Sequence, residues 1–363
     1  MRKYVLMTVM ALSMTVYANQ DGGARLIDYV NPFVGTDGYG NVYPGAQIPF
    51  GGIQISPDTD EHFYDCASGY KWNRQSIQGF SLTHLSGTGI PDLGDFLFMP
   101  GTGEIKLNPG TDENPDEGYR SRFSHEEEKA TPGYYGVMLK DYGVKAEMTS
   151  AVRSGMFRFT YPKSDKSFIL IDLNHTLWQK CVWSNIRVEN DSVVTGYKLV
   201  KGWGPERHIY FRAVFSKPLK NFMIYQDQKP VIYNTSRFRS NREAWGPNIM
   251  FTATFSTDAD EVVTVKTSIS AISTDGAALN MRELDGMTFD SVKALAEQKW
   301  EKELSTYTIK GTREQKETFY TSAYHAALCP FVYNDADGSY LGLDKNVEKE
   351  SGFTNRTEFS FWD

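Results

Sequence analysis

Between about Ala24 and Ile272, hydrophobic and polar residues follow the two-residue period of β-strands. Successive side chains of a strand point to opposite faces, so short alternating or continuous runs of β-branched and aromatic residues indicate strands. Such runs occur at Gly136–Leu139, Val144–Met148, Met156–Tyr161, Phe168–Leu173, Val193–Tyr197, Ile209–Phe215, Ile249–Phe255 and Val262–Ile269. Glycine, proline, asparagine and aspartate separate them at turns. The pattern predicts a mostly β chain with a large, curved, two-sheet β-sandwich.

After Asp285 the hydrophobic period becomes that of an amphipathic helix. One stripe at spacings of three and four consists of Phe289, Val292, Leu295, Ala296, Trp300 and Leu304. Thr288 precedes this stripe and is a typical N-cap residue. The sequence therefore predicts a linker helix after the sandwich.

A second helix is predicted from the capping box Thr312-Arg313-Glu314-Gln315, in which the first and last side chains bond each other's backbone. This helix must end near Cys329, because Pro330 follows and disfavours helical backbone. Its inward positions are Phe319, Tyr320, Ala323, Tyr324 and Ala327. A helical domain thus begins at about Thr312. The residues from there to Asp363 are too few to bury its apolar face, so we expect exposed apolar surface on both helical segments.

Composition excludes several classes of protein. The 363 residues are 40% hydrophobic and 14% aromatic, which is typical of a globular chain rather than a disordered one. Single cores stop growing near about 250–300 residues, so one large domain and part of another are expected. The net charge of −7 argues against a nucleic-acid or acidic-membrane partner, because such partners need a basic surface. Neutral substrates fit this charge better.

The first residues have the pattern of a signal peptide. Arg2 and Lys3 are basic, Tyr4–Met14 is apolar but too short to span a bilayer, and Val16-Tyr17-Ala18 has the cleavage spacing. We expect residues 1–18 to be removed and the protein to be exported, periplasmic or secreted, without a membrane span.

Three cysteines, Cys66, Cys181 and Cys329, are too few for a disulfide scaffold. Buried small hydrophobic residues are the simplest interpretation, and a bridge between Cys66 and Cys181 stays open. No CxxC or HxxxH pair indicates zinc. The charged run His125–Lys129 is interpreted as a solvated surface loop.

Glycine-rich and aromatic segments gather early in the chain, at Asn31–Ala46, Cys66–Trp72 and Gly79–Gly89. Glycines permit positive φ and close backbone approach, and exposed Tyr or Trp rings suit the apolar faces of sugars. A phosphate loop is disfavoured, because the third glycine is misplaced and no Lys-Ser/Thr follows. A structural loop that closes one end of the sandwich remains an alternative.

His84, Asp92 and Asp95 could be a metal trio, and His84 could form a nucleophilic system with Ser81 or Ser86. No Gly-x-Ser-x-Gly elbow supports a nucleophile. A structural hydrogen-bonding role for His84, and turn-capping roles for the two aspartates before the predicted strand Phe96–Met99, stay open.

Together these segments resemble glycoside hydrolase family 92. The matching strings are Val30–Thr36, Tyr43–Ala46, Pro49–Gly51, Gln54–Thr59, Ser68–Tyr70, Gly79–Ser81, Thr83–Gly89 and Asp92–Asp95. The resemblance continues through Trp300, Glu314–Tyr320, Tyr324-His325 and Phe361–Asp363. Tyr39-Gly40-Asn41 departs from a His-rich family pattern, which affects the rim of the pocket.

The resemblance implies an exported exo-acting α-mannosidase. Its expected domains are a β-sandwich (19–275), a helical linker (276–311) and the start of an (α/α)6 helical barrel (312–363). Family members invert the anomeric centre with a glutamate as general acid and an aspartate as general base, and a calcium ion holds the O2 and O3 hydroxyls. The acid, the base and the calcium ligands would lie beyond Asp363, so we expect a truncated chain that is inactive alone.

By the same resemblance, Asp363 would hold mannose hydroxyls beside Trp362. Loops from the sandwich would complete the pocket wall through Gly38, Tyr39, Gly40, Cys66, Trp72 and His84. The substrates would be mannose-containing glycans, either N-glycans or mannan. Two alternatives from other classes are a non-catalytic glycan-binding sandwich and a purely structural interaction domain.

Overall fold

The structure is a computed structural model that describes residues 24–59, 66–202, 206–233, 241–350 and 352–357. The predicted signal peptide (residues 1–18), Trp362 and Asp363 lie outside these ranges. Within them, no helix is both long enough and apolar enough to cross a bilayer.

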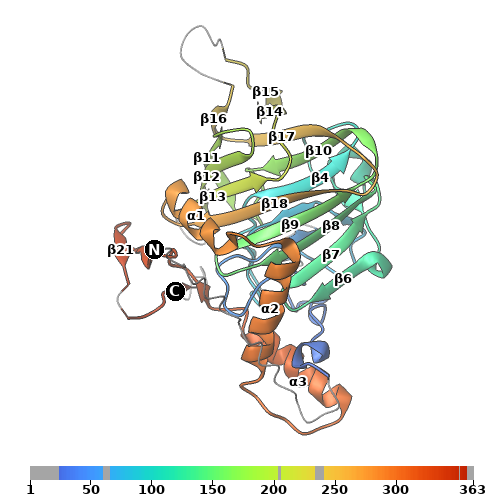
Figure 1. Ribbon diagram of the computed structural model, residues 1–363, viewed down its shortest axis with the longest axis vertical. Helices are drawn as coiled ribbons and strands as arrows, with labels where there is room; N and C mark the ends of the chain where they lie inside the picture. Colours follow the sequence, from blue (N-terminus) through green and yellow to red (C-terminus); the bar gives the residue numbers. More distant parts are fainter. Residues whose placement is uncertain (1–23, 60–65, 203–205, 234–240, 351, 358–363) are drawn as a thin grey trace, which may run out of the picture.

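Two large antiparallel sheets form the sandwich (Figure 1). The first sheet has seven strands in the order β1 (Ser56–Asp58), β3 (Gly79–Ser81), β4 (Leu97–Thr102), β10 (Ser164–Asp172), β17 (Ile249–Thr257), β14 (Asn221–Gln226) and β15 (Lys229–Pro230). The second has nine, in the order β16 (Glu243–Gly246), β11 (Lys180–Val188), β12 (Val193–Lys201), β13 (Arg207–Phe215), β18 (Glu261–Ser270), β9 (Ser154–Tyr161), β8 (Val144–Ser150), β7 (Tyr134–Leu139) and β6 (Glu128–Thr131). The predicted two-sheet sandwich is confirmed.

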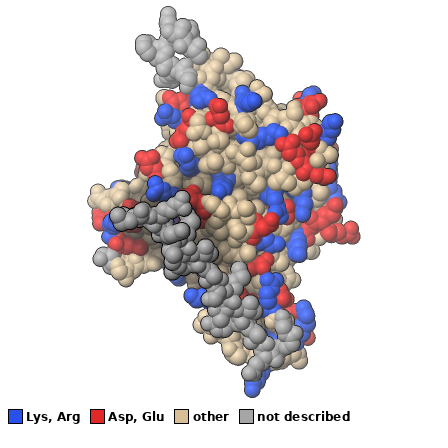
Figure 2. Space-filling view, viewed as in Figure 1, with Lys and Arg blue, Asp and Glu red and all other residues tan. Residues whose placement is uncertain are grey.

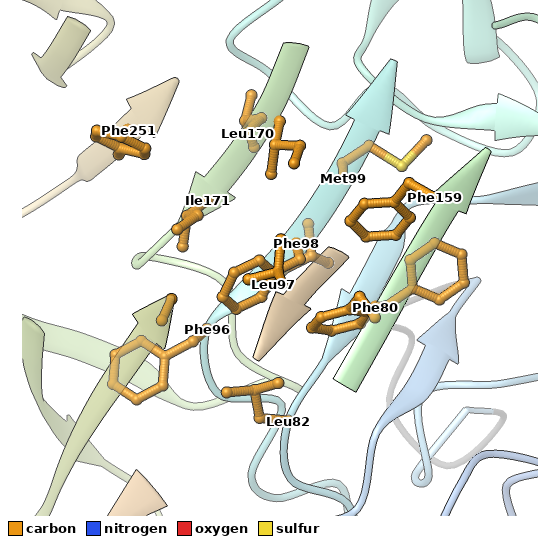
Figure 3. Packing of buried hydrophobic residues seen from close by; sticks show 14 of the residues in the cluster. Phe80, Leu82, Phe96, Leu97, Phe98, Met99, Phe159, Leu170, Ile171 and Phe251 are labelled. Atoms are coloured by element: carbon orange, nitrogen blue, oxygen red, sulfur yellow. The ribbon is translucent and has the colours of Figure 1, made fainter. Parts of the chain in front are cut away.

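Aromatic and aliphatic side chains from both sheets fill the space between them (Figure 3). The ring of Phe98 from β4 lies 5.0 Å from that of Phe157 on β9, and Phe96 lies 4.4 Å from Phe211 on β13. All four side chains are fully buried. Contacts of this kind across the two sheets make one continuous core, which is the main source of the sandwich's stability.

Shorter elements complete the described chain. They are η1 (Leu26–Tyr29), the pair β2 (Ser76–Ile77) and β5 (Ser121–Arg122), η2 (Pro115–Glu117), η3 (His125–Glu127), η4 (Arg282–Leu284), the pair β19 (Phe331–Val332) and β22 (Arg356–Thr357), and the pair β20 (Ser339–Leu341) and β21 (Val347–Lys349).

Three helices follow the sandwich. Helix α1 (Thr274–Met281) packs on β18 and β13, and α2 (Phe289–Leu304) packs on β8 and β9, so both cover the outer face of the nine-stranded sheet (Figure 1). Helix α3 (Arg313–Ala326) packs on η1 and α2. The predicted N-cap Thr288 and the capping box that begins at Thr312 are both confirmed.

The apolar stripes of α2 and α3 are covered, contrary to the expectation of exposed apolar faces on both helical segments. Trp300 of α2 is fully buried, donates a hydrogen bond from Nε1 to the carbonyl oxygen of Gln47 (2.6 Å), and packs 4.5 Å from the ring of Tyr324. Tyr320 of α3 stacks on Tyr29 of η1. The sandwich and η1 therefore supply the surface that a complete helical domain was expected to supply.

Candidate functional site

Three neighbouring loops form the candidate site, which we call the loop cluster: residues 35–41, 66–72 and 84–89. The Trp72 backbone N–H donates to the Thr36 carbonyl (3.0 Å), and the Gly87 N–H donates to the Asn41 carbonyl (2.7 Å). The Ser68 hydroxyl donates to the same Asn41 carbonyl. Each loop is thereby held by another, so segments that lie up to about fifty residues apart in the sequence form one surface.

The tip of the first loop exposes an aromatic ring. Tyr39 is 82% exposed, and the Lys71 ammonium lies 6.0 Å from the centre of its ring while donating to the Gly38 carbonyl. Gly40 must be glycine, because a Cβ there would lie 2.2 Å from the Gly35 carbonyl oxygen. Gly38, Tyr39 and Gly40, which the sequence analysis named as site residues, thus form a compact tip at the edge of the loop cluster.

Trp72 has an exposed indole in a fixed orientation. The side chain is 36% exposed, and the His125 imidazole stacks on it with 3.6 Å between ring centres and 2° between ring planes. Phe33 contacts the indole edge-on at 5.2 Å. A ring held on two sides with surface remaining exposed is suited to stacking against a sugar.

His125 is in turn held by a buried carboxylate. Its Nε2 donates to the Trp72 carbonyl (2.8 Å), and its Nδ1 lies 2.6 Å from Oε2 of Glu128. The Glu128 side chain is fully buried and also accepts from the hydroxyls of Tyr70 and Tyr135. Burial raises the pKa of Glu128, although the hydrogen bonds from Tyr135 and His125 oppose that shift.

The interpretation of His125–Lys129 as a solvated surface loop is therefore wrong for two of its residues. Glu126, Glu127 and Lys129 are exposed, whereas His125 and Glu128 turn inward and hold Trp72. A charged run gives no indication of which of its members faces a tryptophan more than fifty residues away in the sequence.

His84 is the first residue of the third loop, and its side chain is fully buried. Its Nδ1 donates to the Gln54 carbonyl (2.9 Å), and its Nε2 lies 2.8 Å from Oδ1 of Asp58. The second Asp58 oxygen lies 2.9 Å from Nε2 of His175. Burial alone would raise the pKa of Asp58, but the charge of His84 and the hydrogen bonds from both imidazoles hold it well below its usual range. The structure thus gives His84 the structural hydrogen-bonding role that the sequence left open.

The nucleophile and metal hypotheses for His84 have no support in this geometry. Ser81 Oγ lies 3.1 Å from His84 Nε2, but Asp58 occupies the same nitrogen, and all three side chains are buried. A catalytic triad needs the nucleophile and the orienting carboxylate on opposite nitrogens of the histidine. Among the described residues, no group of three or more His, Cys, Asp or Glu side chains could hold a metal ion.

Cys66 begins the second loop and is 1% exposed. Cys66, Cys181 and Cys329 all lie in described segments, and none is in a disulfide, so the bridge between Cys66 and Cys181 that the sequence left open is absent.

Asp95, which follows the third loop in the sequence, lies in a buried ion cluster. The Arg207 guanidinium donates to both its carboxylate oxygens (2.6 and 2.9 Å), the Lys198 ammonium lies at 3.2 Å, and the Thr83 hydroxyl donates at 2.7 Å. Burial would raise the pKa of Asp95, yet the two cations hold it well below its usual range. Arg207 and Lys198 belong to β13 and β12, so this cluster fixes the loop to the nine-stranded sheet.

Asp92 is expected to make stability fall as pH rises. Burial raises its pKa from 3.8 to about 6, and attraction to Arg207 only partly offsets this. The folded state therefore keeps this proton to higher pH than the unfolded state, and stability is lost as pH rises from 3.8 to about 6. The shift corresponds to about 3 kcal/mol at most. In urea titrations, Asp92→Asn should exceed the wild type in unfolding free energy by about 2 kcal/mol at neutral pH and match it near pH 4.

Glu117→Gln is the matched control, because Glu117 is an exposed carboxyl in η2 and should change stability at neither pH. An Asp92→Asn variant less stable than the wild type at neutral pH would show that the ionised carboxylate is stabilising there.

A small cavity lies between the sandwich and the segment after α3. Its volume is about 40 Å³, and its lining includes Arg153, Arg207, Asn280 and Asp335. One water molecule takes about 30 Å³ of liquid, so this cavity is too small for a sugar ring. A larger, open hollow of about 450 Å³ is lined by Asp337, Glu350 and Phe353 among others. The loop cluster is the candidate for glycan recognition because the exposed rings of Tyr39 and Trp72 lie there.

Comparison with known proteins shows the family of this chain. The architecture is a large sandwich followed by helices, and residues 276–363 match the "Glycosyl hydrolase family 92 catalytic domain", which places the chain in the class of glycosyl hydrolase sequences. Residues 29–270 match the "Glycosyl hydrolase family 92 N-terminal domain". The chain belongs to glycosyl hydrolase family 92.

Solved structures agree with this assignment. A family 92 α-mannosidase from Bacteroides thetaiotaomicron is 71% identical, with a TM-score of 0.90, over 92% of this chain and 45% of that one. The same protein has been solved in complex with mannoimidazole. A family 92 inverting mannosidase from Bacteroides thetaiotaomicron VPI-5482 is 26% identical, with a TM-score of 0.79, over 93% of this chain and 44% of that one.

A secreted glycosidase from Arthroderma benhamiae, uncharacterized by its description, is 24% identical over 90% of this chain and 44% of its own length. The chain thus spans less than half the length of each of these relatives.

Proposed function

We propose that the protein, at the full length of its relatives, is an exported, calcium-dependent, inverting exo-α-mannosidase. It releases terminal mannose from N-glycan or mannan chains, and this chain supplies the sandwich wall of its active site. The main structural support for this proposal is the loop cluster, in which His125 and Phe33 hold the exposed indole of Trp72. One Bacteroides relative has been solved with mannoimidazole, which supports the substrate. The other is named an inverting mannosidase, which supports the stereochemistry.

The loop cluster recognises the sugar rather than cleaving it. In the proposal, the exposed indole of Trp72 stacks on the apolar face of mannose, and Tyr39 limits the rim. Inversion requires two carboxyl groups about 6.5–9.5 Å apart with room for water between them. The buried carboxyls Asp58, Asp95 and Glu128 are already engaged with neighbouring cations, imidazoles or hydroxyls. As the family resemblance implies, we assign the general acid and general base to residues beyond Asp363.

Calcium is proposed because the family resemblance implies it. Ca²⁺ prefers six to eight oxygen ligands, and two vicinal hydroxyls of mannose could supply part of that set. The described residues do not fit such a site, since they contain no suitable group of acidic or imidazole ligands. None of the contacts within the loop cluster requires the ion.

The proposal predicts that hydrolysis depends on a metal ion while the sandwich does not. With the full-length protein and an aryl α-mannoside, EDTA should lower the rate at least about tenfold, and added Ca²⁺ should restore it. EDTA should leave the unfolding of residues 1–363 unchanged, because no calcium ligands are proposed there. The same 363 residues alone should show no turnover.

Three outcomes would count against parts of this proposal. Full activity in EDTA would remove the calcium requirement, and preference for an α-glucoside would overturn the substrate. Robust hydrolysis by the 363-residue chain would contradict the position assigned to the acid and the base.

A further inference from the structure

A second aromatic surface lies on the outer face of the nine-stranded sheet, away from the loop cluster. We call it the aromatic strip, and its members are Trp183, Tyr197, His208, Tyr210 and Trp245. They come from β16, β11, β12 and β13, which are four neighbouring strands in this order in the sheet. Residues that alternate with them along these strands, such as Ile186, Lys198, Ile209 and Ala244, are buried. The strip therefore faces outward.

Strand register places these side chains in two adjacent rows. In one row, Tyr197 lies directly opposite Tyr210 on one side and Asn185 on the other, and Asn185 lies opposite Trp245. In the next row, Leu199 lies between Trp183 and His208. Strands are about 4.8 Å apart, so the first row extends across about 14 Å of sheet surface.

The strip exposes rings whose burial would be favourable. Trp183 is 45% exposed and Trp245 is 38% exposed. The rings of Tyr197 and Tyr210 lie 4.8 Å apart at 38°, and the Tyr197 hydroxyl lies 2.9 Å from Nδ1 of His208. Contiguous exposed aromatic surface on a soluble protein is typical of an interaction site.

The polar groups of the strip favour a neutral ligand. Asn185 places an amide between the rings, whereas both ring nitrogens of His208 are engaged, by Tyr197 and Glu206. At one end of the strip, Arg212 pairs with Glu189 at 3.0 Å and Arg187 with Glu243 at 4.0 Å. At the other end, Lys180 and Lys201 lie opposite each other and are exposed. Figure 2 shows basic and acidic side chains among each other over the face in view. The two rows themselves contain no lysine, arginine, aspartate or glutamate, so a ligand that contacts them needs no charge.

We propose that the aromatic strip is a second carbohydrate site, which binds an internal stretch of a neutral α-mannan chain. The choice of mannan rests on the proposed function. Aromatic faces contact the sugar rings, and the amide oxygen of Asn185 accepts a hydrogen bond from a sugar hydroxyl. Because contacts are distributed over about 14 Å, an oligosaccharide binds more tightly than a monosaccharide.

Affinity electrophoresis through gels containing soluble α-mannan, with EDTA present, tests this proposal on the 363-residue chain and on the full-length protein. Mannan should retard both, and Trp183→Ala should weaken binding at least about fivefold. Trp245→Ala is the second variant in case the first fails to fold, and unchanged melting temperatures establish that each is folded. Tyr307→Ala is the matched control, because Tyr307 is exposed (48%) but lies outside the strip. Trp72→Ala reports on the loop cluster.

Retardation that falls in Trp183→Ala and not in Tyr307→Ala would support the strip, whether or not Trp72→Ala also lowers it. No retardation, or retardation lost only in Trp72→Ala, would overturn it. A Trp183→Ala variant with altered molecular mass in light scattering would also overturn it, because the strip would then be a protein contact. The binding assay needs neither turnover nor calcium. A full-length protein that binds mannan but shows no mannosidase activity with Ca²⁺ present would therefore contradict the proposed function and leave the strip proposal standing.

Discussion

Replacing Asp95 by alanine should lower the free energy of unfolding by about 3–5 kcal/mol, the usual cost of removing one partner from a buried ion pair. Asp95 and Lys198 are fully buried, and Arg207 is nearly so. The substitution would leave two cations in the interior without the carboxylate that lies between them. The carboxylate offsets their desolvation in the folded protein, and the alanine variant lacks it.

Thermal and urea denaturation of the 363-residue chain would measure this loss, which corresponds to a fall of roughly 5 °C in melting temperature. Asp116→Ala is the control, because Asp116 pairs with Arg122 at 2.6 Å on the exposed surface and should cause no resolvable change. A loss below about 1 kcal/mol for Asp95→Ala would mean that the cluster is hydrated or rearranges, contrary to the burial seen here.

Replacing Trp72 by alanine should lower kcat/KM of the full-length protein for an α-mannoside by about thirtyfold. Covering about 80 Å² of one indole face at roughly 25 cal/mol per Å² gives about 2 kcal/mol. Stacking acts on the bound substrate as well as on the transition state, so KM should rise more than kcat falls. Trp72→Phe, which keeps an aromatic face, should retain most of the activity.

Tyr307→Ala controls for loss of an exposed ring elsewhere and should match the wild type. If Trp72→Ala stayed within about threefold of the wild type, the loop cluster would not be a wall of the sugar site. Intact folding of the variant must be shown, because the Trp72 backbone also bonds Thr36.

Elements with strong local signals could be predicted from the sequence. The β-periodic runs correspond to strands of the sandwich, and the capping residues Thr288 and Thr312 start α2 and α3. Strand β11 was missed, because a shift of register between Cys181 and Trp183 breaks its alternation. Helix α1 was missed as well: it contains Gly276 and has no clear apolar stripe, so packing on β18 and β13 decides its conformation.

Only those parts of the site that lie within single short segments could be predicted from the sequence. The glycine-rich and aromatic composition indicated the three loops of the loop cluster, and the family resemblance indicated their use. The side chains that hold those loops come from distant strands: Arg207 is 112 residues from Asp95, and His175 is 117 residues from Asp58. Such pairs are set by strand order, which periodicity does not reveal. The roles predicted for Trp362 and Asp363 stay predictions, because both residues lie outside the described ranges.

The most direct test of the central claim is time-resolved proton NMR of an α-mannoside treated with the full-length protein. The proposal predicts that β-mannose appears first and then mutarotates, because an inverting exo-α-mannosidase delivers water opposite the leaving group. Initial release of α-mannose, or no release of mannose from an α-mannoside, would contradict it.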